Sequence, residues 1–343
     1  MKTLNKTGLV LFLSLCALQA QAQLPDQKPD IPLPEGVEMK TYTFAVREEG
    51  ELKLDVYRDK SFEGQTLPVF MYVYGGAWSS GSRKDAPFMP KFAKRGYAGV
   101  CIEYRLRLKG QEYADSTGFG AQFQNAIRTA VEDVYDATAF LIGHAQELGI
   151  DPEKIVISGG SAGATNSIMA EYWLCNEDPL ATERLPKDFG YAAVVSFAGG
   201  VWKIGMEDPA WKRTPCPHMF VHGDKDQLVP FNKNLIPASN YGAFGPEYLL
   251  PLLHREGVSY QLIKSVDADH FMAGGPDYTA WGVDIDYTET VFNFLDRTVF
   301  HGEKVAIETV ERPYDNPRTL EWMFQELAKK LEEMQKNQQN NAQ

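Results

Sequence analysis

The sequence predicts an α/β fold in which helices cover both faces of a mostly parallel central sheet. Short apolar runs rich in β-branched and aromatic residues alternate with longer segments of helical periodicity. The expected strands are residues 69–74, 98–104, 155–158, 192–197, 218–222 and 260–266, and the expected helices lie near residues 86–95, 122–148, 162–175, 247–256 and 286–300. Strands that alternate with helices form parallel sheets, and ligands bind beyond the carboxyl ends of their strands. A functional site is therefore expected in the loops that follow these strands.

An antiparallel pair of strands, residues 41–46 and 52–57, is expected to open the folded region. Tyr42, Phe44 and Val46 alternate with other residues, which is typical of a strand with one buried face. The pair precedes the parallel part of the sheet along the chain.

The N-terminal residues have the features of a secretory signal peptide. Lys2 and Lys6 precede the apolar run 8–18, which is followed by the small residues of Ala20-Gln21-Ala22. We expect residues 1–22 to be removed by cleavage after Ala22, and the mature protein to be exported, either periplasmic or secreted. The apolar run is too short to span a bilayer, and no later segment is long and apolar enough to do so.

The rest of the chain divides into three regions. Residues 23–40 are rich in proline and are expected to form an extended lead-in, whereas residues 41–301 are expected to form one α/β domain. Residues 302–343 depart from this plan, because a turn-rich connector precedes a charged segment of helical periodicity, residues 319–335, and a tail rich in Gln and Asn. We expect this region to be a C-terminal helical extension with a polar tail.

Charge and cysteine content argue against several classes of partner and cofactor. The formal net charge of −12 disfavours nucleic acids and anionic membrane surfaces as partners. Cys101, Cys175 and Cys216 remain after loss of the signal peptide, and this odd, widely spaced set lacks metal-ligand spacing. We therefore expect no bound metal, no nucleic acid partner and at least one unpaired cysteine in the monomer.

Residues 159–163 read Gly-Gly-Ser-Ala-Gly, which matches the G-x-S-x-G pattern of a serine nucleophile on a tight turn. The pentapeptide follows an expected strand and precedes an expected helix, which is the context the pattern requires. Gly159 and Gly163 remove side chains that would collide where strand and helix approach, and a serine on so sharp a turn usually serves as a nucleophile. The alternative is a glycine-rich turn in which Ser161 is incidental.

A serine nucleophile needs a base, and the base needs an orienting carboxylate. Asp224 and Asp226 follow the expected strand that ends at residue 222, and His270 follows the one that ends at residue 266. We favour Asp226 as the acid, keep Asp224 as the alternative, and expect His270 to be the general base. The order Ser, Asp, His along the chain supports this choice, because it is the order found in serine hydrolases built on such sheets.

The other histidines fit a catalytic role less well. His144 and His254 fall inside expected helices, His218 begins an expected strand, and His301 lies beyond the last expected helix. His222 ends an expected strand but lies too close in sequence to the expected acid.

Hydrolysis of an ester or amide also requires N–H donors directed at the oxyanion. The small residues of Gly75-Gly76-Ala77 follow an expected strand, and the amides of Gly76 and Ala77 can turn inward there. Ala162, directly after the serine, is the expected second source of an N–H group. The alternative is an ordinary glycine turn between a strand and a helix.

As a set, these motifs make residues 41–300 resemble an α/β-hydrolase of the esterase/lipase group that has a His-Gly-Gly-Gly oxyanion motif. Bacterial carboxylesterases and feruloyl or acetylxylan esterases are the relatives that the motifs suggest. The resemblance implies an α/β-hydrolase fold, a catalytic domain over residues 41–301 and chemistry without a cofactor. It assigns Ser161 as nucleophile, Asp226 as acid, His270 as base, and Gly76, Ala77 and Ala162 as oxyanion donors.

Two positions depart from the pattern of that group. Tyr74 replaces the first histidine of the oxyanion motif, and Ala77 replaces its third glycine. Backbone donors survive both changes, whereas the histidine side chain that would brace the loop is lost.

Three functions agree with the sequence. The favoured one is an exported carboxylesterase that uses a small-molecule or carbohydrate ester, with acetyl or feruloyl groups on plant polysaccharides as the expected substrates. Trp78 and Trp202 are candidate substrate-binding residues, with burial in the core as the alternative for each. The other two functions are a serine exopeptidase similar to the prolyl oligopeptidase group and an inactive binding protein with a hydrolase fold.

Overall fold

The computed structural model describes residues 33–279, 283–312, 319, 321–322 and 325. The predicted signal peptide, most of the predicted lead-in, and most of the predicted C-terminal helix and tail lie outside these residues and stay predictions. Within the described ranges, none of the helices combines the length and apolar character needed to cross a lipid bilayer.

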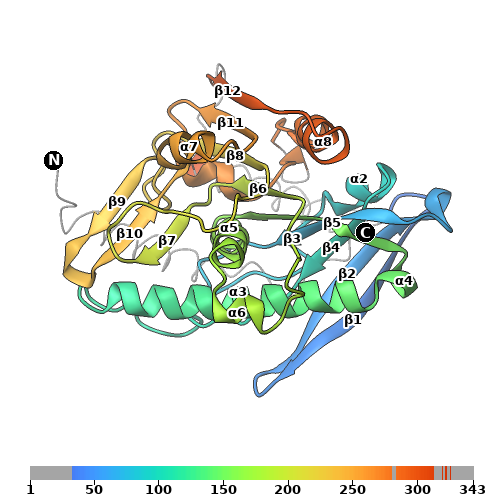
Figure 1. The fold of residues 1–343 in the computed structure, drawn as a ribbon, viewed down its shortest axis with the longest axis horizontal. Helices are drawn as coiled ribbons and strands as arrows, with labels where there is room; N and C mark the ends of the chain where they lie inside the picture. Colours follow the sequence, from blue (N-terminus) through green and yellow to red (C-terminus); the bar gives the residue numbers. More distant parts are fainter. Residues whose placement is uncertain (1–32, 280–282, 313–318, 320, 323–324, 326–343) are drawn as a thin grey trace, which may run out of the picture.

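A nine-stranded sheet forms the centre of the molecule (Figure 1), with the strand order β1-β2-β4-β3-β5-β6-β8-β11-β12. Its strands are β1 (Val37–Arg47), β2 (Gly50–Asp59), β3 (Leu67–Val73), β4 (Ala98–Ile102), β5 (Ile150–Gly160), β6 (Ala193–Phe197), β8 (His218–Gly223), β11 (Tyr260–Ser265) and β12 (Ala306–Glu311). The pairs β1·β2 and β2·β4 are antiparallel, and the other pairs are parallel. The predicted fold class, a mostly parallel sheet that opens with an antiparallel pair, is confirmed.

The register of the parallel strands brings their carboxyl ends together at one edge of the sheet. Val73 of β3 pairs with Gly159 of β5, and Ser265 of β11 pairs with Gly223 of β8. The loops after β3 and β5 therefore leave the sheet side by side, as do the loops after β8 and β11. These are the four loops that hold the residues of the predicted site.

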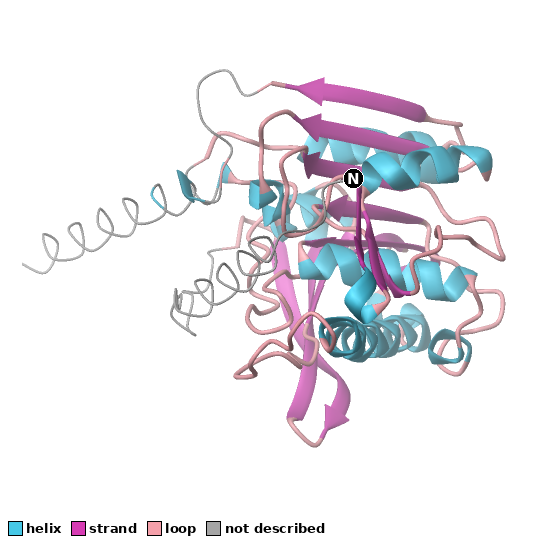
Figure 2. Cartoon of the chain, turned by 90° about the vertical axis from the view of Figure 1, so that its left-hand side faces the viewer, coloured by secondary structure: helices cyan, strands magenta, loops and turns pink. Residues whose placement is uncertain are grey.

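Helices flank the sheet in two groups (Figures 1 and 2). The helices are α2 (Met89–Lys94), α3 (Phe119–Gly143), α4 (Ala145–Leu148), α5 (Ala162–Cys175), α6 (Pro179–Thr182), α7 (Pro246–Arg255) and α8 (Thr288–Leu295), with short helical turns at Lys60–Phe62, Pro237–Ser239, His270–Gly274 and Asp296–Phe300. Phe92 of α2 packs on Phe292 of α8, whereas α3 packs on α5. The helix predicted over residues 122–148 is divided, because the backbone of His144 has φ −110° and separates α3 from α4.

Two parts of the sheet structure were absent from the sequence prediction. A second, three-stranded antiparallel sheet contains β7 (Val201–Ile204), β10 (Tyr241–Phe244) and β9 (Lys233–Ile236). In addition, β12 pairs in parallel with β11, and β1 begins at Val37, so the central sheet extends beyond the range 41–301 at both ends. The region predicted as an appended extension thus begins with an edge strand of the domain, which is mostly exposed and therefore has a weak apolar pattern.

Strands β3, β4 and β6, near the middle of the sheet, lie in the hydrophobic core. All residues of β4 and β6 are buried, and β3 is buried except for Pro68. Their continuous apolar sequences are those expected for parallel strands that are covered on both faces. This buried platform fixes the strand ends from which the loops of the site project.

A buried carboxylate joins the N-terminal strands to the longest helix. Asp133 of α3 is fully buried, and it accepts hydrogen bonds from the backbone N–H of Arg105 and from the guanidinium Nε of the same residue at 2.8 and 2.9 Å. Arg47 of β1 approaches Asp133 at 3.3 Å and also pairs with Asp136. Burial raises the pKa of Asp133, and the charge and hydrogen bonds of Arg105 oppose that rise.

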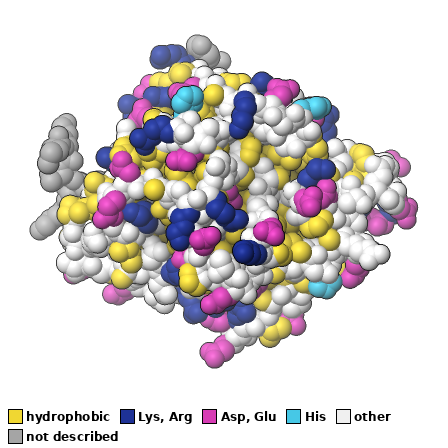
Figure 3. All heavy atoms as spheres, in the orientation of Figure 1, with side chains coloured by type: hydrophobic (Ala, Val, Ile, Leu, Met, Phe, Trp, Pro, Cys, Tyr) yellow, Lys and Arg dark blue, Asp and Glu magenta, His cyan; other side chains and the backbone are white. Residues whose placement is uncertain are grey.

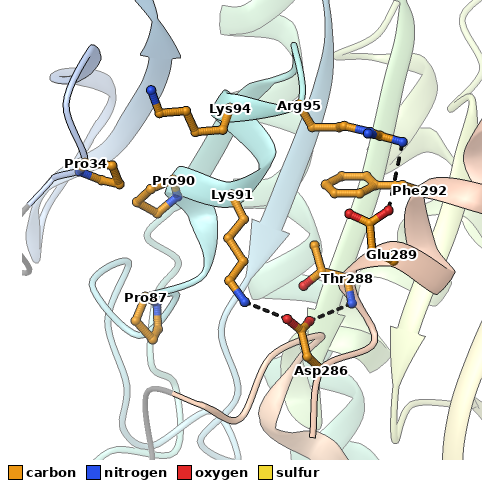
Figure 4. Close-up of a pocket in the computed structure, with 10 residues that line it drawn as sticks. All are labelled: Pro34, Pro87, Pro90, Lys91, Lys94, Arg95, Asp286, Thr288, Glu289 and Phe292. Carbon is orange, nitrogen blue, oxygen red and sulfur yellow. Dashed lines mark hydrogen bonds and ion pairs between the residues drawn. The ribbon is translucent and has the colours of Figure 1, made fainter.

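The face of the molecule in Figure 3 carries charges of both signs. Lys and Arg side chains lie among Asp and Glu side chains over the face in Figure 3. A groove of about 530 Å³ lies between α2 and α8 (Figure 4), where Lys91 forms an ion pair with Asp286 at 2.6 Å. Ser161, Asp226 and His270 do not line this groove.

Removal of the buried carboxylate should destabilise the fold. We expect Asp133→Ala to lower the free energy of unfolding by about 3 kcal/mol, because the partly buried guanidinium of Arg105 loses its buried partner and keeps only the more exposed Glu132. The measurement is urea denaturation followed by circular dichroism. As a control, Glu38→Gln breaks the exposed ion pair with Lys60 and should leave the midpoint unchanged. Equal effects of the two substitutions would contradict the structural role of Asp133.

Candidate active site

Ser161 occupies a strained turn between β5 and α5. Its backbone has φ 53° and ψ −120°, a conformation that costs a non-glycine residue about 1–3 kcal/mol. The Ser161 N–H donates to the carbonyl of Phe197 at 2.9 Å, which ties the turn to the neighbouring strand β6. The strand, turn and helix context predicted for the pentapeptide is therefore present.

The glycines around Ser161 are required by close packing. A Cβ atom on Gly163 would overlap the carbonyl oxygen of Val73, and one on Gly160 would overlap that of Ala273. A Cβ atom on Gly75 would come within 3.2 Å of the Ser161 Cβ. The turn is thus wedged between the end of β3 and the helical turn that begins at His270.

His270 and Asp226 complete a hydrogen-bonded chain with Ser161. The Ser161 hydroxyl lies 2.7 Å from His270 Nε2, and His270 Nδ1 lies 2.7 Å from Asp226 Oδ2. Because a carboxylate only accepts hydrogen bonds, Nδ1 carries the ring proton and donates a hydrogen bond to Asp226. The lone pair of Nε2 then faces the serine hydroxyl. In this tautomer Nε2 can accept the serine proton, the arrangement of a nucleophile with its base and orienting acid.

Asp226 is buried, and protein hydrogen-bond donors surround its carboxylate. Its Oδ1 accepts from the backbone N–H groups of Leu228 and Val229, both at 2.9 Å. Burial opposes ionisation, yet the charge of His270 and hydrogen bonds from His222 and His270 hold the pKa of Asp226 well below its usual range. The carboxylate therefore stays ionised beside the imidazole.

Asp224, the alternative acid, has a different position. Its Oδ1 accepts the backbone N–H of Asp267 at 2.8 Å, and the N–H of Asp224 donates to the carbonyl of Ser265. The Lys225 N–H donates to the carbonyl of Ala268 in the same way. Asp224 therefore links the loop after β8 to the loop that presents His270, and Asp226 is the aspartate that the structure brings to His270.

His222 is part of the site although sequence reasoning set it aside. Its Nε2 lies 2.9 Å from the carbonyl oxygen of Val229 and 3.3 Å from Asp226 Oδ2. Since a carbonyl only accepts, Nε2 bears a proton that points at both oxygens. The sequence signal is the spacing of four residues between His222 and Asp226. In the sequence analysis the same closeness argues against His222 as the catalytic base.

The loop after β3 presents the predicted oxyanion donors. Gly76, Ala77 and Trp78 have φ values of 114°, 52° and 57°, so three successive residues have positive φ. Within the described part of the chain, the N–H groups of Gly76, Ala77 and Ala162 donate to no backbone oxygen. Ala162 is the first residue of α5, where helix N–H groups are free to bind an anion.

Tyr74, which replaces the histidine of the expected motif, has its own means of holding the strand end. Its hydroxyl donates to the carbonyl of Tyr104 at 3.3 Å, and the hydroxyl of Tyr104 donates to the carbonyl of Tyr74 at 3.1 Å. The two rings stack with centroids 4.4 Å apart. This reciprocal pair holds β3 and the segment after β4 together directly before the loop.

Trp78 and Trp202 lie in the core. Each is only 3% exposed, and both rings pack on Phe123. This burial favours the second of the two interpretations, a packing role, because little ring area is left for a substrate.

Among the residues that the structure describes, Cys101, Cys175 and Cys216 are free thiols. No group of three or more His, Cys, Asp or Glu side chains in these ranges is arranged to hold a metal ion.

Comparison with known proteins finds similarity to esterases over part of the chain. A family model described as BD-FAE matches residues 54–201. A probable carboxylic ester hydrolase of Mycobacterium tuberculosis, LipM, is 33% identical over 121 residues, which cover 34% of this chain and 24% of that protein. A probable isoprenylcysteine alpha-carbonyl methylesterase of Arabidopsis thaliana is 30% identical over 113 residues, which cover 33% of this chain and 20% of that protein.

Solved structures show the same fold over most of the chain. The esterase Est2 of Thermogutta terrifontis matches with a TM-score of 0.55 and 22% identity, covering 79% of this chain and 95% of its own. Esterase B of Lactobacillus rhamnosis matches with a TM-score of 0.55 and 15% identity, covering 86% and 95%. The chain has the α/β-hydrolase fold.

The chain therefore has an α/β-hydrolase fold and, over part of its length, is similar to esterases, which is the resemblance that its motifs indicate. The matches to the curated relatives span only part of those proteins, 24% of LipM and 20% of the Arabidopsis methylesterase.

The close packing at Ser161 predicts a sharp difference between two glycines. We expect Gly163→Ala to lower the free energy of unfolding by about 1–3 kcal/mol, because the added Cβ meets the Val73 carbonyl oxygen. Gly190→Ala is the matched control, since nothing lies within 4 Å of a Cβ at that position. Thermal unfolding by calorimetry measures both. If Gly163→Ala were as stable as the control, the turn would be less closely packed than described.

Proposed function

We propose that this protein is a carboxylic ester hydrolase that acts through an acyl-enzyme intermediate on Ser161. The observation that carries the proposal is the chain of two 2.7 Å hydrogen bonds from Ser161 through His270 to the buried Asp226. The strained backbone of Ser161 supports it, because such strain usually serves function. The esterase names of several relatives agree with it.

In the acylation step, Ser161 Oγ attacks the ester carbonyl carbon while His270 Nε2 takes its proton. The carbonyl oxygen becomes an oxyanion, for which Ala162 and the loop at Gly76 and Ala77 offer N–H groups. The intermediate collapses, the bond to the alcohol oxygen breaks, and His270 returns the proton to the leaving alcohol. Asp226 remains ionised and stabilises the imidazolium that forms.

In the deacylation step, water takes the place of the alcohol. His270 removes a proton from the water as it attacks the acyl carbon, a second oxyanion forms in the same position, and the proton then passes to Ser161 Oγ as the acid leaves. Each step transfers a proton through one nitrogen atom, so no cofactor is required for the balance of the reaction.

The proposed setting is outside the cytoplasm, and the proposed substrates are acetyl or feruloyl esters of plant polysaccharides. The lysines, apolar run and small residues of positions 1–22 support export. The names of relatives include a methylesterase and a fumonisin B1 esterase, which name different substrates. The relatives as a set therefore support ester hydrolysis in general, and the acyl group of the substrate is tested separately below.

Three substitutions test the catalytic chain. We expect Ser161→Ala to abolish labelling by a fluorophosphonate probe and to reduce p-nitrophenyl acetate hydrolysis by about 10³-fold or more. Asp226→Ala should reduce kcat by about 10⁴-fold, because His270 loses the group that fixes its tautomer. Asp224→Ala is the matched comparison and should retain most activity. A folded Asp224→Ala without activity, beside an active Asp226→Ala, would reverse the assignment of the acid.

A substrate panel tests the acyl group. The purified protein is assayed with acetylated xylan, methyl ferulate, p-nitrophenyl esters of rising chain length and an aminoacyl arylamide. We expect hydrolysis of the acetyl or feruloyl esters, with the highest kcat/KM for one of them. Cleavage of the arylamide without cleavage of any ester would point instead to an exopeptidase, and a wild-type protein that is inactive and unlabelled would leave only a binding role.

A further inference from the structure

We propose that Asn166 is a positioning residue that holds the oxyanion loop, residues 75–78, on helix α5 by accepting a hydrogen bond from the indole of Trp78. This inference rests on the proposed function and extends it to a residue that the sequence motifs did not single out. Asn166 does not reach the reacting atoms in this scheme, because it acts through Trp78.

The loop has a backbone that needs support from elsewhere in the fold. Ala77 and Trp78 have φ values of 52° and 57°, and a bulky residue with positive φ is a genuine outlier. Gly76 has a φ of 114°, and its conformation brings the loop back on itself so that the N–H groups of Ser79 and Ser80 both donate to the Gly76 carbonyl. A conformation of this kind persists only when the surrounding structure fixes it.

The bond from Trp78 to Asn166 is well formed and shielded from water. Trp78 Nε1 lies 2.8 Å from Asn166 Oδ1, the indole is 3% exposed, and Asn166 is fully buried. An indole nitrogen is only a donor, so the oxygen of the amide and not its nitrogen must face Trp78. In a buried, low-dielectric setting this bond is costly to lose from one side, which makes it an effective tether.

Asn166 lies on the same helix as the other expected oxyanion donor. Helix α5 begins at Ala162, directly after Ser161, and Asn166 is in its second turn. The hydrogen bond therefore places Trp78, and with it the amides of Gly76 and Ala77, relative to the helix that carries the Ala162 amide. One rigid element sets the positions of both sources of N–H groups.

The other hydrogen bonds of the loop do not connect it to α5. The Leu108 N–H donates to the Trp78 carbonyl at 2.9 Å, which ties the loop to another loop. The bonds to the Gly76 carbonyl are internal. Among the hydrogen bonds of the described residues, the bond to Asn166 is the one that connects residues 75–78 to α5.

Two substitutions that remove the same hydrogen bond from opposite sides test the proposal. Trp78→Phe removes the donor and keeps an aromatic ring, and Asn166→Leu removes the acceptor at similar volume. We expect each to lower kcat about 10- to 100-fold with KM changed less than about 2-fold, because donors displaced by a fraction of an ångström stabilise the oxyanion less. The double variant should be no worse than either single variant, because both act on one bond.

The inhibition constant of a trifluoromethyl ketone separates this role from general damage to the fold. The ketone forms an oxyanion on the serine, so its Ki should rise in parallel with the fall in kcat/KM. Trp173→Phe, the same substitution at the far end of α5, is the control and should leave both values unchanged. Asn166→Asp keeps the acceptor oxygen, so it should retain more activity than Asn166→Leu and serves if the leucine variant does not fold.

The outcomes distinguish this inference from the proposed function. An active wild-type protein whose Trp78→Phe and Asn166→Leu variants keep kcat within about 2-fold overturns the role of Asn166 alone. A fall in kcat without a rise in the Ki of the ketone overturns it as well, as do additive effects in the double variant. A wild-type protein that hydrolyses no ester and takes up no fluorophosphonate overturns the proposed function instead.

Discussion

The near contact between the end of β5, the start of α5 and the end of β3 is the constraint on which the site depends. At Gly163 a side chain would overlap the carbonyl oxygen of Val73, so the helix begins against the strand backbone. The chain can make this turn only with a positive φ at Ser161. The strain exposes the hydroxyl at the strand end and brings the Ala162 amide beside it, so one packing requirement positions both the proposed nucleophile and a proposed oxyanion donor.

A second constraint is electrostatic, because the site keeps a negative charge in a buried position. Asp226 remains ionised since two backbone N–H groups hold one carboxylate oxygen and two histidines approach the other. Removing the donors would leave a buried, unpaired charge, which proteins avoid by protonation. The loop after β8 therefore surrounds the carboxylate with hydrogen-bond donors. The hydrogen bond between Asp224 and the next loop links this loop to the one that presents His270.

The sequence predicts those features that local patterns specify. Continuous apolar runs identified the parallel strands, and strand-end positions identified Ser161, Asp226 and His270. Strands β7, β9 and β10 were missed because they are only four residues long, and β12 because an exposed edge strand has little apolar periodicity. His222 and Asn166 were missed for a different reason, because each acts through a tertiary contact. His222 contacts Asp226 and the Val229 carbonyl, and Asn166 accepts a hydrogen bond from Trp78 in the loop after β3.

The oxyanion motif shows why residue identity and loop support must be considered separately. The expected histidine is absent at Tyr74, and a sequence comparison alone would suggest a loop without a brace. In the structure the strand end is held by the reciprocal bonds of Tyr74 and Tyr104, and the loop itself by Trp78 on Asn166. The first support comes from Tyr74, at the position of the missing histidine, and the second comes from Trp78, directly beyond the small residues of the motif. A loop can therefore keep inward-facing amides after losing a motif residue, provided that its strained backbone is fixed to a rigid element, and here that element is the helix that follows the serine.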